Sequence, residues 1–274
     1  KNKAGYMAFF CNSGTEANEA AFKLARRWGL LNGEKSKIVS FSGAFHGRTF
    51  GSLSATSPKK YRYGFYPLTP GFKSVPFNDV DKLEALVKKD KKIAAIIVEP
   101  IQGEAGVYTP NEDFLGKARI LCSEYNVLLI ADEIQTGIGR TGSLLASCGN
   151  CTCEDKNCSG TPEVKADILI LGKAVSGGVY PVSAVLADDA IMKVIKPGQH
   201  GSTFGGNPLA AKVAIAALDV IKDEDLANNA SFLEVAYLLI YGNLPTEDQY
   251  KKFNDDIKSE SIVDEDIKKI LDGF

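Results

Sequence analysis

The sequence predicts an α/β fold in which a mainly parallel sheet carries helices on both faces. The first observation is that short apolar runs, among them IAAIIVEP and VLLIADE, alternate with helix-like segments of ten or more residues. The second is that several of these runs are almost entirely apolar, as in strands that are buried on both faces. The third is that polar residues follow these runs directly, at the strand ends where such sheets bind ligands.

Six segments are predicted to be strands: YMAFFCNSG, KIVSFSG, IAAIIVEP, VLLIADE, ADILILGK and PVSAVLAD. The segment TEANEAAFKLARRWG has apolar residues at helical spacing, and Ser13 or Thr15 can cap its start. Three further segments are predicted to be helices: DVDKLEALVKKD, NEDFLGKARILCSEYN and NPLAAKVAIAALDVI, with Pro208 entering the first turn of the last.

The tail changes character after about Ala230, and from Ser231 onward we predict helices and no strand. Two capping boxes are expected there, Ser231 with Glu234 and Thr246 with Gln249, and Gly242 can end the first helix. We therefore divide the chain into an incomplete large domain, residues 1–230, and a helical tail of different origin, residues 231–274.

Composition restricts the possible partners. The chain has 274 residues, a net charge of −2 and no apolar run long enough to cross a bilayer. We therefore expect small-molecule partners and neither nucleic acid nor a membrane. Because the chain begins at Lys1 without an initiator Met, we expect a fragment. A cytoplasmic location is expected, with the mitochondrial matrix as the alternative.

The six cysteines fall into two groups. Cys11 and Cys122 lie in apolar surroundings and are expected in the core. The others crowd into CGNCTCEDKNC, at Cys148, Cys151, Cys153 and Cys158. They could hold zinc, form a disulfide or redox switch, or simply belong to a loop. Because one residue separates Cys151 from Cys153, which is awkward for paired zinc knuckles, we predict no metal site.

Residues at the predicted strand ends could carry chemistry. Gly14 and Thr15 open a helix, whose free N–H groups favour a phosphate, although an ordinary N-cap explains them equally. Asp132 and Glu133 follow a buried strand. A carboxylate there is costly unless it is paired, so either a cationic ring nitrogen or a structural salt bridge is expected.

Lys173 also follows an apolar run, and glycines come soon after it. Its amine could attack a carbonyl carbon, or the side chain could simply extend to solvent from a strand end. Gly177 and Gly178 could let a ligand approach the backbone or form a plain turn. An aromatic such as Phe45 can stack on a flat ring, and Arg48 can bind a carboxylate. Taken together, these residues fit pyridoxal 5′-phosphate as a cofactor.

The ordered motifs between about residues 5 and 230 go beyond this general pattern. They are NSGTEANEAAFKLAR, FHGRTFGSLSATS, VEPIQGEAGV, ADEIQTGIGRTG, LGKAVSGGVYPVSAVL and HGSTFGGNPLAAKVAIAAL. The segment resembles the class III pyridoxal-phosphate aminotransferases, and so many motifs in order make a chance match improbable. The resemblance implies the fold type I large domain. The tail resembles a helical stretch of citrate synthase without that enzyme's catalytic residues.

The resemblance also implies roles for individual residues. For the cofactor these are Gly14 and Thr15 on the phosphate, Phe45 and Ile134 on the ring faces, Asp132 on the ring nitrogen, Gln135 on the phenolic oxygen, and Lys173 as the Schiff-base lysine. Arg48 would bind a substrate carboxylate. Glu104 would lie near the substrate and act with Lys173 and Asp132, and Glu99 would be a structural carboxylate. Ser202 and Thr203 would reach the phosphate in a neighbouring subunit, which implies a homodimer with shared active sites.

The implied reaction is transfer of an amino group between an amino acid and a 2-oxo acid. GGVYPVSAVL favours the ornithine-directed branch, in which the δ-amino group passes to 2-oxoglutarate and gives glutamate 5-semialdehyde and glutamate. Acetylornithine and 4-aminobutyrate are the alternative amine donors. The sequence does not contain the family's N-terminal segment or small C-terminal domain. A truncated, non-catalytic remnant or a chimeric gene product is therefore a further alternative.

Overall fold

The computed structural model describes residues 6–148, 164–222 and 232–260. By packing, the chain divides into two units, residues 1–214 and residues 215–274. The boundary predicted near Ala230 separates two segments of different expected origin, which packing does not test, so it stays a prediction.

The first unit is built on a seven-stranded sheet with the order β1-β7-β6-β5-β4-β2-β3. Neighbouring strands are parallel except at β7, which is antiparallel to both β1 and β6. The strands are β1 (Tyr6–Cys11), β2 (Lys37–Phe41), β3 (Phe72–Val75), β4 (Ile93–Val98), β5 (Leu128–Asp132), β6 (Ile168–Leu171) and β7 (Ser183–Asp188). The predicted α/β fold with a mainly parallel sheet is confirmed.

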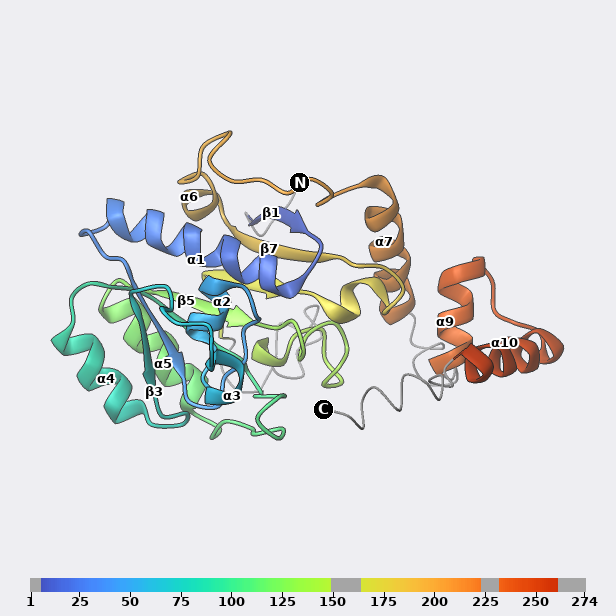
Figure 1. Cartoon of the computed structure of the whole chain (residues 1–274), viewed down its shortest axis with the longest axis horizontal. Helices are drawn as coiled ribbons and strands as arrows, with labels where there is room; N and C mark the ends of the chain where they lie inside the picture. The colour runs from blue at the N-terminus through green and yellow to red at the C-terminus, as the bar shows by residue number, and fades with distance from the viewer. Residues whose placement is uncertain (1–5, 149–163, 223–231, 261–274) are drawn as a thin grey trace, which may run out of the picture. The chain divides into compact units, whose positions relative to one another are not determined.

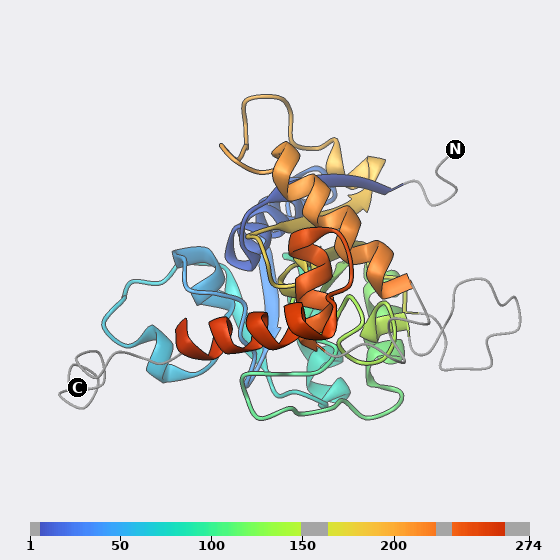
Figure 2. The same ribbon diagram turned by 90° about the vertical axis from the view of Figure 1, so that its right-hand side faces the viewer.

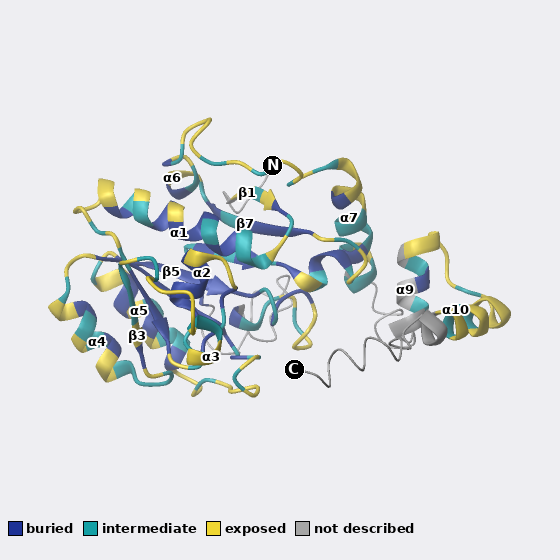
Figure 3. Ribbon diagram, in the orientation of Figure 1, coloured by how far each residue is buried: buried dark blue, intermediate teal, exposed yellow. Residues whose placement is uncertain are grey.

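Helices cover both faces of this sheet (Figure 1). On one face α1 (Gly14–Leu31) and α6 (Asp189–Met192) enclose a core, and on the other α4 (Val80–Lys89) and α5 (Phe114–Glu124) enclose a second. Strand β4 serves both cores: Ala95 and Ile97 face the first, whereas Ile96 and Val98 face the second. Because side chains alternate along a strand, β4 has to be apolar throughout, and Figure 3 shows these central strands buried.

Two features of the sheet were not predicted. Strand β3 has the sequence FKSV and is mostly half-buried at the sheet edge, so it lacks the apolar run that identifies the central strands. Strand β7 was predicted as a strand, but its antiparallel direction was not. Eleven residues, among them one short 3₁₀ turn, separate it from β6, which is enough for an antiparallel return but short for a parallel crossover.

The remaining helical elements of the described chain are α2 (Phe50–Ala55), α3 (Lys59–Arg62), the 3₁₀ turns η1 (Ala146–Cys148) and η2 (Lys173–Ser176), α7 (Pro208–Lys222), α9 (Phe232–Tyr241) and α10 (Glu247–Glu260). The helix predicted at NPLAAKVAIAALDVI is therefore confirmed as α7, and Pro208 is its first residue. No helix in the described ranges is both long enough and apolar enough to cross a membrane.

Helices α9 and α10 pack against each other within the second unit, and Figure 2 shows the short connection that joins them. The Tyr237 ring meets the Phe253 ring edge-on at a centroid distance of 5.3 Å. The predicted Thr246–Gln249 capping box is confirmed by reciprocal hydrogen bonds of 2.8 and 3.4 Å. Gly242 follows α9 with a positive φ of 83°, as predicted for a helix end. Ser231 lies outside the described residues.

Candidate active site

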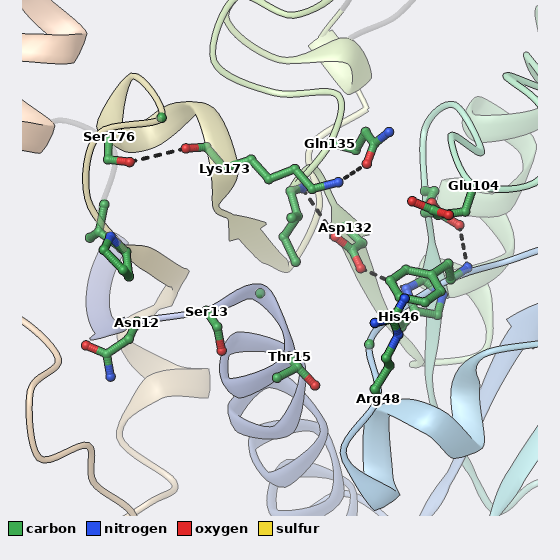
Figure 4. A pocket seen from close by; sticks show the side chains of 18 of the residues that line it. Asn12, Ser13, Thr15, His46, Arg48, Glu104, Asp132, Gln135, Lys173 and Ser176 are labelled. Carbon is green, nitrogen blue, oxygen red and sulfur yellow. Dashed lines mark hydrogen bonds and ion pairs between the residues drawn. The ribbon is translucent and has the colours of Figure 1, made fainter. Parts of the chain in front are cut away.

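The carboxyl ends of the strands surround a cavity of about 850 Å³ (Figure 4). The loops after β1, β4, β5 and β6 all contribute to its wall. Nine residues predicted from the sequence line it together: Gly14, Thr15, Phe45, Arg48, Glu104, Asp132, Ile134, Gln135 and Lys173. Residues separated by more than 150 positions in the chain therefore meet in one site because parallel strands end at the same edge.

Lys173 lies where β6 ends and η2 begins, and its backbone φ is +41°. A positive φ is uncommon for a residue with a side chain and occurs mostly where function or packing enforces it. The ammonium group donates a hydrogen bond to Gln135 Oε1. The side chain of Lys173 is exposed and lines the cavity, so its amine is accessible to a ligand there.

Asp132 is the most extensively bonded carboxylate in the cavity wall. Its Oδ2 accepts from His46 Nδ1 at 2.8 Å and from Asn18 Nδ2 at 3.1 Å. Its Oδ1 accepts only the backbone N–H of Ile134, at 3.2 Å. The residue is 4% exposed, so these donors fix its position and compensate for its burial. Oδ1 is the oxygen that keeps acceptor capacity for a cationic partner in the cavity.

His46 and Glu99 form a buried ionisable pair next to Asp132. Burial lowers the pKa of His46, but its hydrogen bond to Asp132 and the charges of Asp132 and Glu99 outweigh that effect, so the pKa is raised. Burial and the charge of Asp132 raise the pKa of Glu99 to about 7, although His46 opposes the shift. Glu99 Oε2 also accepts the backbone N–H of Phe45 at 2.9 Å. This hydrogen bond holds the backbone beside the cavity, which is compatible with the structural role that the resemblance implies for Glu99.

The start of α1 forms the opposite wall. Ser13 is the N-cap, and Glu16 completes a capping box with it. The backbone N–H groups of Gly14 and Thr15 lie in the first turn, where no carbonyl of the helix is available to accept from them. Such N–H groups can bind an anion. A Cβ added to Gly14 would lie 2.6 Å from Ile134 Cδ1, so the backbone there is close to a cavity side chain. The capping and anion-binding explanations of this turn are compatible.

Phe45, Tyr61 and Arg48 form a stack at the cavity edge. The Arg48 guanidinium lies 5.8 Å from the Phe45 ring centroid and 5.6 Å from that of Tyr61. Tyr61 Oη also donates to Glu104 Oε2 at 3.5 Å. Arg48 is exposed and forms no ion pair with the described acidic side chains, so its forked donors remain available to an incoming carboxylate.

Glu133 points away from the cavity, although it adjoins Asp132 in the chain. It is fully buried and accepts from Ser147 N at 2.7 Å, from Ala146 N at 3.2 Å and from the Thr136 hydroxyl. The structural explanation therefore holds for Glu133. Its carboxylate ties the loop after β5 to the segment that contains η1.

Ser202 and Thr203 do not line the main cavity. They border a second cavity of about 410 Å³, together with Asn12, Thr49 and His200. Ser202 Oγ accepts from Asn12 Nδ2 at 3.2 Å, and Thr203 is exposed. Their action on a neighbouring subunit's phosphate stays a prediction.

Sequence reasoning missed the parts played by Asn18 and His46. Asn18 was detectable as a polar residue within the apolar face Ala17, Ala20 and Ala21 of α1. His46 is one of only two histidines in the sequence, but nothing local indicates that its ring reaches Asp132, 86 residues away. Among the residues described, no group of three metal-binding side chains occurs. Cys151, Cys153 and Cys158 lie outside the described residues.

The model of the family "Aminotransferase class-III" matches residues 2–259. This chain belongs to the class III aminotransferases. The match extends into the tail, past the boundary predicted near Ala230. The ornithine aminotransferase of Plasmodium yoelii yoelii is 45% identical over 267 residues, which cover 96% of this chain and 61% of that protein. Ornithine aminotransferase 2 of Staphylococcus aureus strain MRSA252 is 51% identical over 219 residues, or 78% of this chain and 52% of that protein.

Solved structures of class III aminotransferases have the same fold. The ornithine aminotransferase of Toxoplasma gondii ME49 has a TM-score of 0.74 and 44% identity, covering 85% of this chain and 53% of that one. The acetylornithine aminotransferase of Elizabethkingia anophelis has a TM-score of 0.63 and 48% identity, covering 84% and 52%. The Toxoplasma gondii enzyme is also described with partial occupancy of PLP at its active site. The chain thus spans about half to three fifths of the length of these relatives.

Proposed function

We propose that this chain is the large-domain part of a pyridoxal-phosphate-dependent ornithine aminotransferase. The observation that carries the proposal is the meeting of Lys173, Asp132 and Gln135 with the first turn of α1 around one cavity. Membership of the class III family supports the same reaction class.

The cavity residues fit the chemical groups of this cofactor. The first-turn amides of α1 suit a phosphate, and the free acceptor capacity of Asp132 Oδ1 suits a protonated ring nitrogen. Phe45 and Ile134 supply apolar surfaces for two ring faces, and Gln135 lies within reach of Lys173. The volume of about 850 Å³ is within the range of natural ligand pockets and leaves space for a substrate.

When bound, the cofactor supplies a conjugated ring that accepts the electron pair released at the reacting carbon of the substrate. Lys173 would hold the cofactor covalently and then carry the proton at its Nζ. Asp132 would keep the proton on the ring nitrogen, because its carboxylate is fixed by His46, Asn18 and the Ile134 amide. Gly14 and Thr15 would orient the phosphate, and Gln135 the phenolic oxygen.

Arg48 and Glu104 would select the substrate. The exposed guanidinium of Arg48 lies beside the Phe45 and Tyr61 rings and can bind the carboxylate of 2-oxoglutarate or glutamate. Glu104 lines the same cavity and can meet an ammonium group. Ornithine is the proposed donor because the named relatives support it, and acetylornithine is the alternative because an acetylornithine enzyme is 48% identical.

A homodimer with shared active sites is part of the proposal. Thr203 is exposed outside the main cavity, and large apolar side chains near it are exposed too, with Phe204 at 70% and Phe10 at 48%. Burial of such side chains against a second copy would remove a large apolar surface from water. Equilibrium sedimentation of the chain with and without cofactor measures this association.

The deciding experiment treats the purified chain with pyridoxal 5′-phosphate, reduces it with borohydride and maps the modified peptide by mass spectrometry. We expect one cofactor per chain on Lys173 and none in Lys173→Ala. Lys193→Ala removes the lysine at the C-terminal cap of α6 and is the matched control, which should be labelled like the wild type. Wild-type protein without label would overturn the cofactor proposal.

The substrate test offers ornithine, acetylornithine and 4-aminobutyrate at equal concentration with 2-oxoglutarate. We expect glutamate to form fastest from ornithine, together with glutamate 5-semialdehyde. Faster turnover of acetylornithine would assign the chain to that branch. Label on Lys173 without turnover of any donor would support a non-catalytic remnant that only binds the cofactor.

A further inference from the structure

Asn18 lies inside the first core, on the buried face of α1, and is 0% exposed. Its Nδ2 donates to the carbonyl oxygen of Gly14 and to Asp132 Oδ2, at 3.1 Å in both cases. Gly14 belongs to the helix turn that faces the cavity, and Asp132 ends β5 on another wall. One amide group thus joins two walls of the active site.

The chemistry of the two partners determines how the amide is oriented. A carbonyl oxygen and a carboxylate oxygen can only accept, so both contacts require the nitrogen of Asn18 and exclude its oxygen. In this orientation Asn18 Oδ1 is buried and has no hydrogen-bond partner among the described residues. An apolar residue would avoid that cost, so stability alone does not account for an asparagine among Ala17, Ala20 and Ala21.

We propose that Asn18 is a positioning residue that sets the separation between the phosphate-binding turn of α1 and the carboxylate that meets the ring nitrogen. His46 also donates to Asp132 Oδ2, but it comes from the loop before α2, and among the described residues its side chain forms no hydrogen bond with α1. Asn18 is therefore the side chain that links Asp132 directly to the turn at Gly14. The inference rests on the proposed cofactor and adds a residue to its support.

The main test compares pyridoxal 5′-phosphate binding by wild type and Asn18→Leu, which keeps the volume and removes the donor. We expect the dissociation constant to rise about ten- to a hundredfold, the effect of losing a hydrogen bond to a charged group. The matched control is Asn32→Leu. Asn32 also donates to a carbonyl four residues earlier in α1, at Trp28, but at the far end of the helix. Its loss should leave the dissociation constant unchanged.

Asn18→Asp provides a signature that a merely structural role would not produce. At pH 8 two carboxylates would face each other, and we expect weaker binding than in Asn18→Leu. At pH 5.5 they can share a proton, which restores a donor toward Asp132. Measured against wild type at each pH, the deficit of Asn18→Asp should shrink about tenfold between pH 8 and 5.5, and that of Asn18→Leu should stay constant.

The outcomes separate the two proposals. A wild-type chain that binds no cofactor overturns the proposed function and this inference together. Wild-type binding with unchanged affinity in Asn18→Leu overturns the inference alone. If Asn18→Leu does not fold, Asn18→Asp decides the question, and a deficit that is independent of pH counts against the positioning role.

Discussion

Asp132 and Glu133 are adjacent and both are buried, yet only Asp132 lines the cavity. Asp132 meets the side chains of Asn18 and His46 and lines the cavity. Glu133 meets the backbone of Ala146 and Ser147 and the hydroxyl of Thr136. The side-chain partners of Asp132 come from two distant segments, and only its Ile134 partner lies in the following loop, whereas all the described partners of the Glu133 carboxylate lie within the 14 residues after it.

The difference shows how burial alone fails to distinguish a functional carboxylate from a structural one. Asp132 is 4% exposed and Glu133 is 0% exposed, so their environments look equally costly. The donors of Glu133 use its two oxygens, whereas Asp132 Oδ1 has a single backbone donor. A carboxylate that can bind a ligand is therefore identified by an oxygen that faces a cavity and can accept a further hydrogen bond, and not by burial.

The largest expected effect is that of Asp132→Asn. The substitution keeps the shape and removes the charge that would stabilise a protonated ring nitrogen, so we expect kcat to fall about a hundred- to a thousandfold. The melting temperature should change by only a few degrees. Steady-state kinetics and thermal melts of the cofactor-loaded protein check both. A loss of stability that accounts for the whole loss of activity would remove the contrast with Glu133.

Glu99 extends the comparison to a carboxylate on the same side as Asp132. Because folding raises its pKa from 4.5 to about 7, the folded state binds the proton more tightly. Its contribution to stability is therefore complete below pH 4.5, declines as the pH rises to 7, and is constant above that. We expect a decline of about 3 kcal/mol in the free energy of unfolding over this interval.

Urea denaturation of wild type and Glu99→Gln from pH 4.5 to 7.5 measures the decline. Glutamine mimics the protonated acid and keeps an acceptor for the Phe45 amide, so the variant should lack the Glu99 contribution. His46 titrates in both proteins, but in the variant its pKa is no longer raised by the charge of Glu99, so the difference between the two curves measures Glu99 together with its coupling to His46. Curves that stay parallel across the whole range would contradict the prediction.

The smallest of the three effects is expected for Glu133→Gln. One of the three donors around this carboxylate would then face an NH₂ group, and we expect a loss of about 2 kcal/mol in the free energy of unfolding. Affinity for pyridoxal 5′-phosphate should change less than about threefold, since the side chain does not line the cavity. Denaturation and binding titrations of the same preparation test both parts. A large loss of affinity for pyridoxal 5′-phosphate with an unchanged free energy of unfolding would mean that Glu133 contributes to cofactor binding.

Much of the site could be predicted because the strand ends are local features of the sequence. Apolar runs followed by Gly14, Glu99, Asp132 or Lys173 indicate the edge at which ligands bind, and parallel topology then brings those residues together. Strand β3 could not be predicted in this way, because an edge strand need not be apolar. Neither could the reach of His46 and Asn18 to Asp132, because a contact between distant segments leaves no pattern in either one.

By itself the sequence determined the α/β fold, the family resemblance and nine residues of one cavity, because hydrophobic periodicity and ordered motifs are properties of neighbouring residues. Only the tertiary structure decided which of two adjacent carboxylates faces the cavity, since nothing in the sequence at the end of β5 says what surrounds each of them. It also decided that Asn18 joins Gly14 to Asp132, because that link depends on how α1 lies against the end of β5.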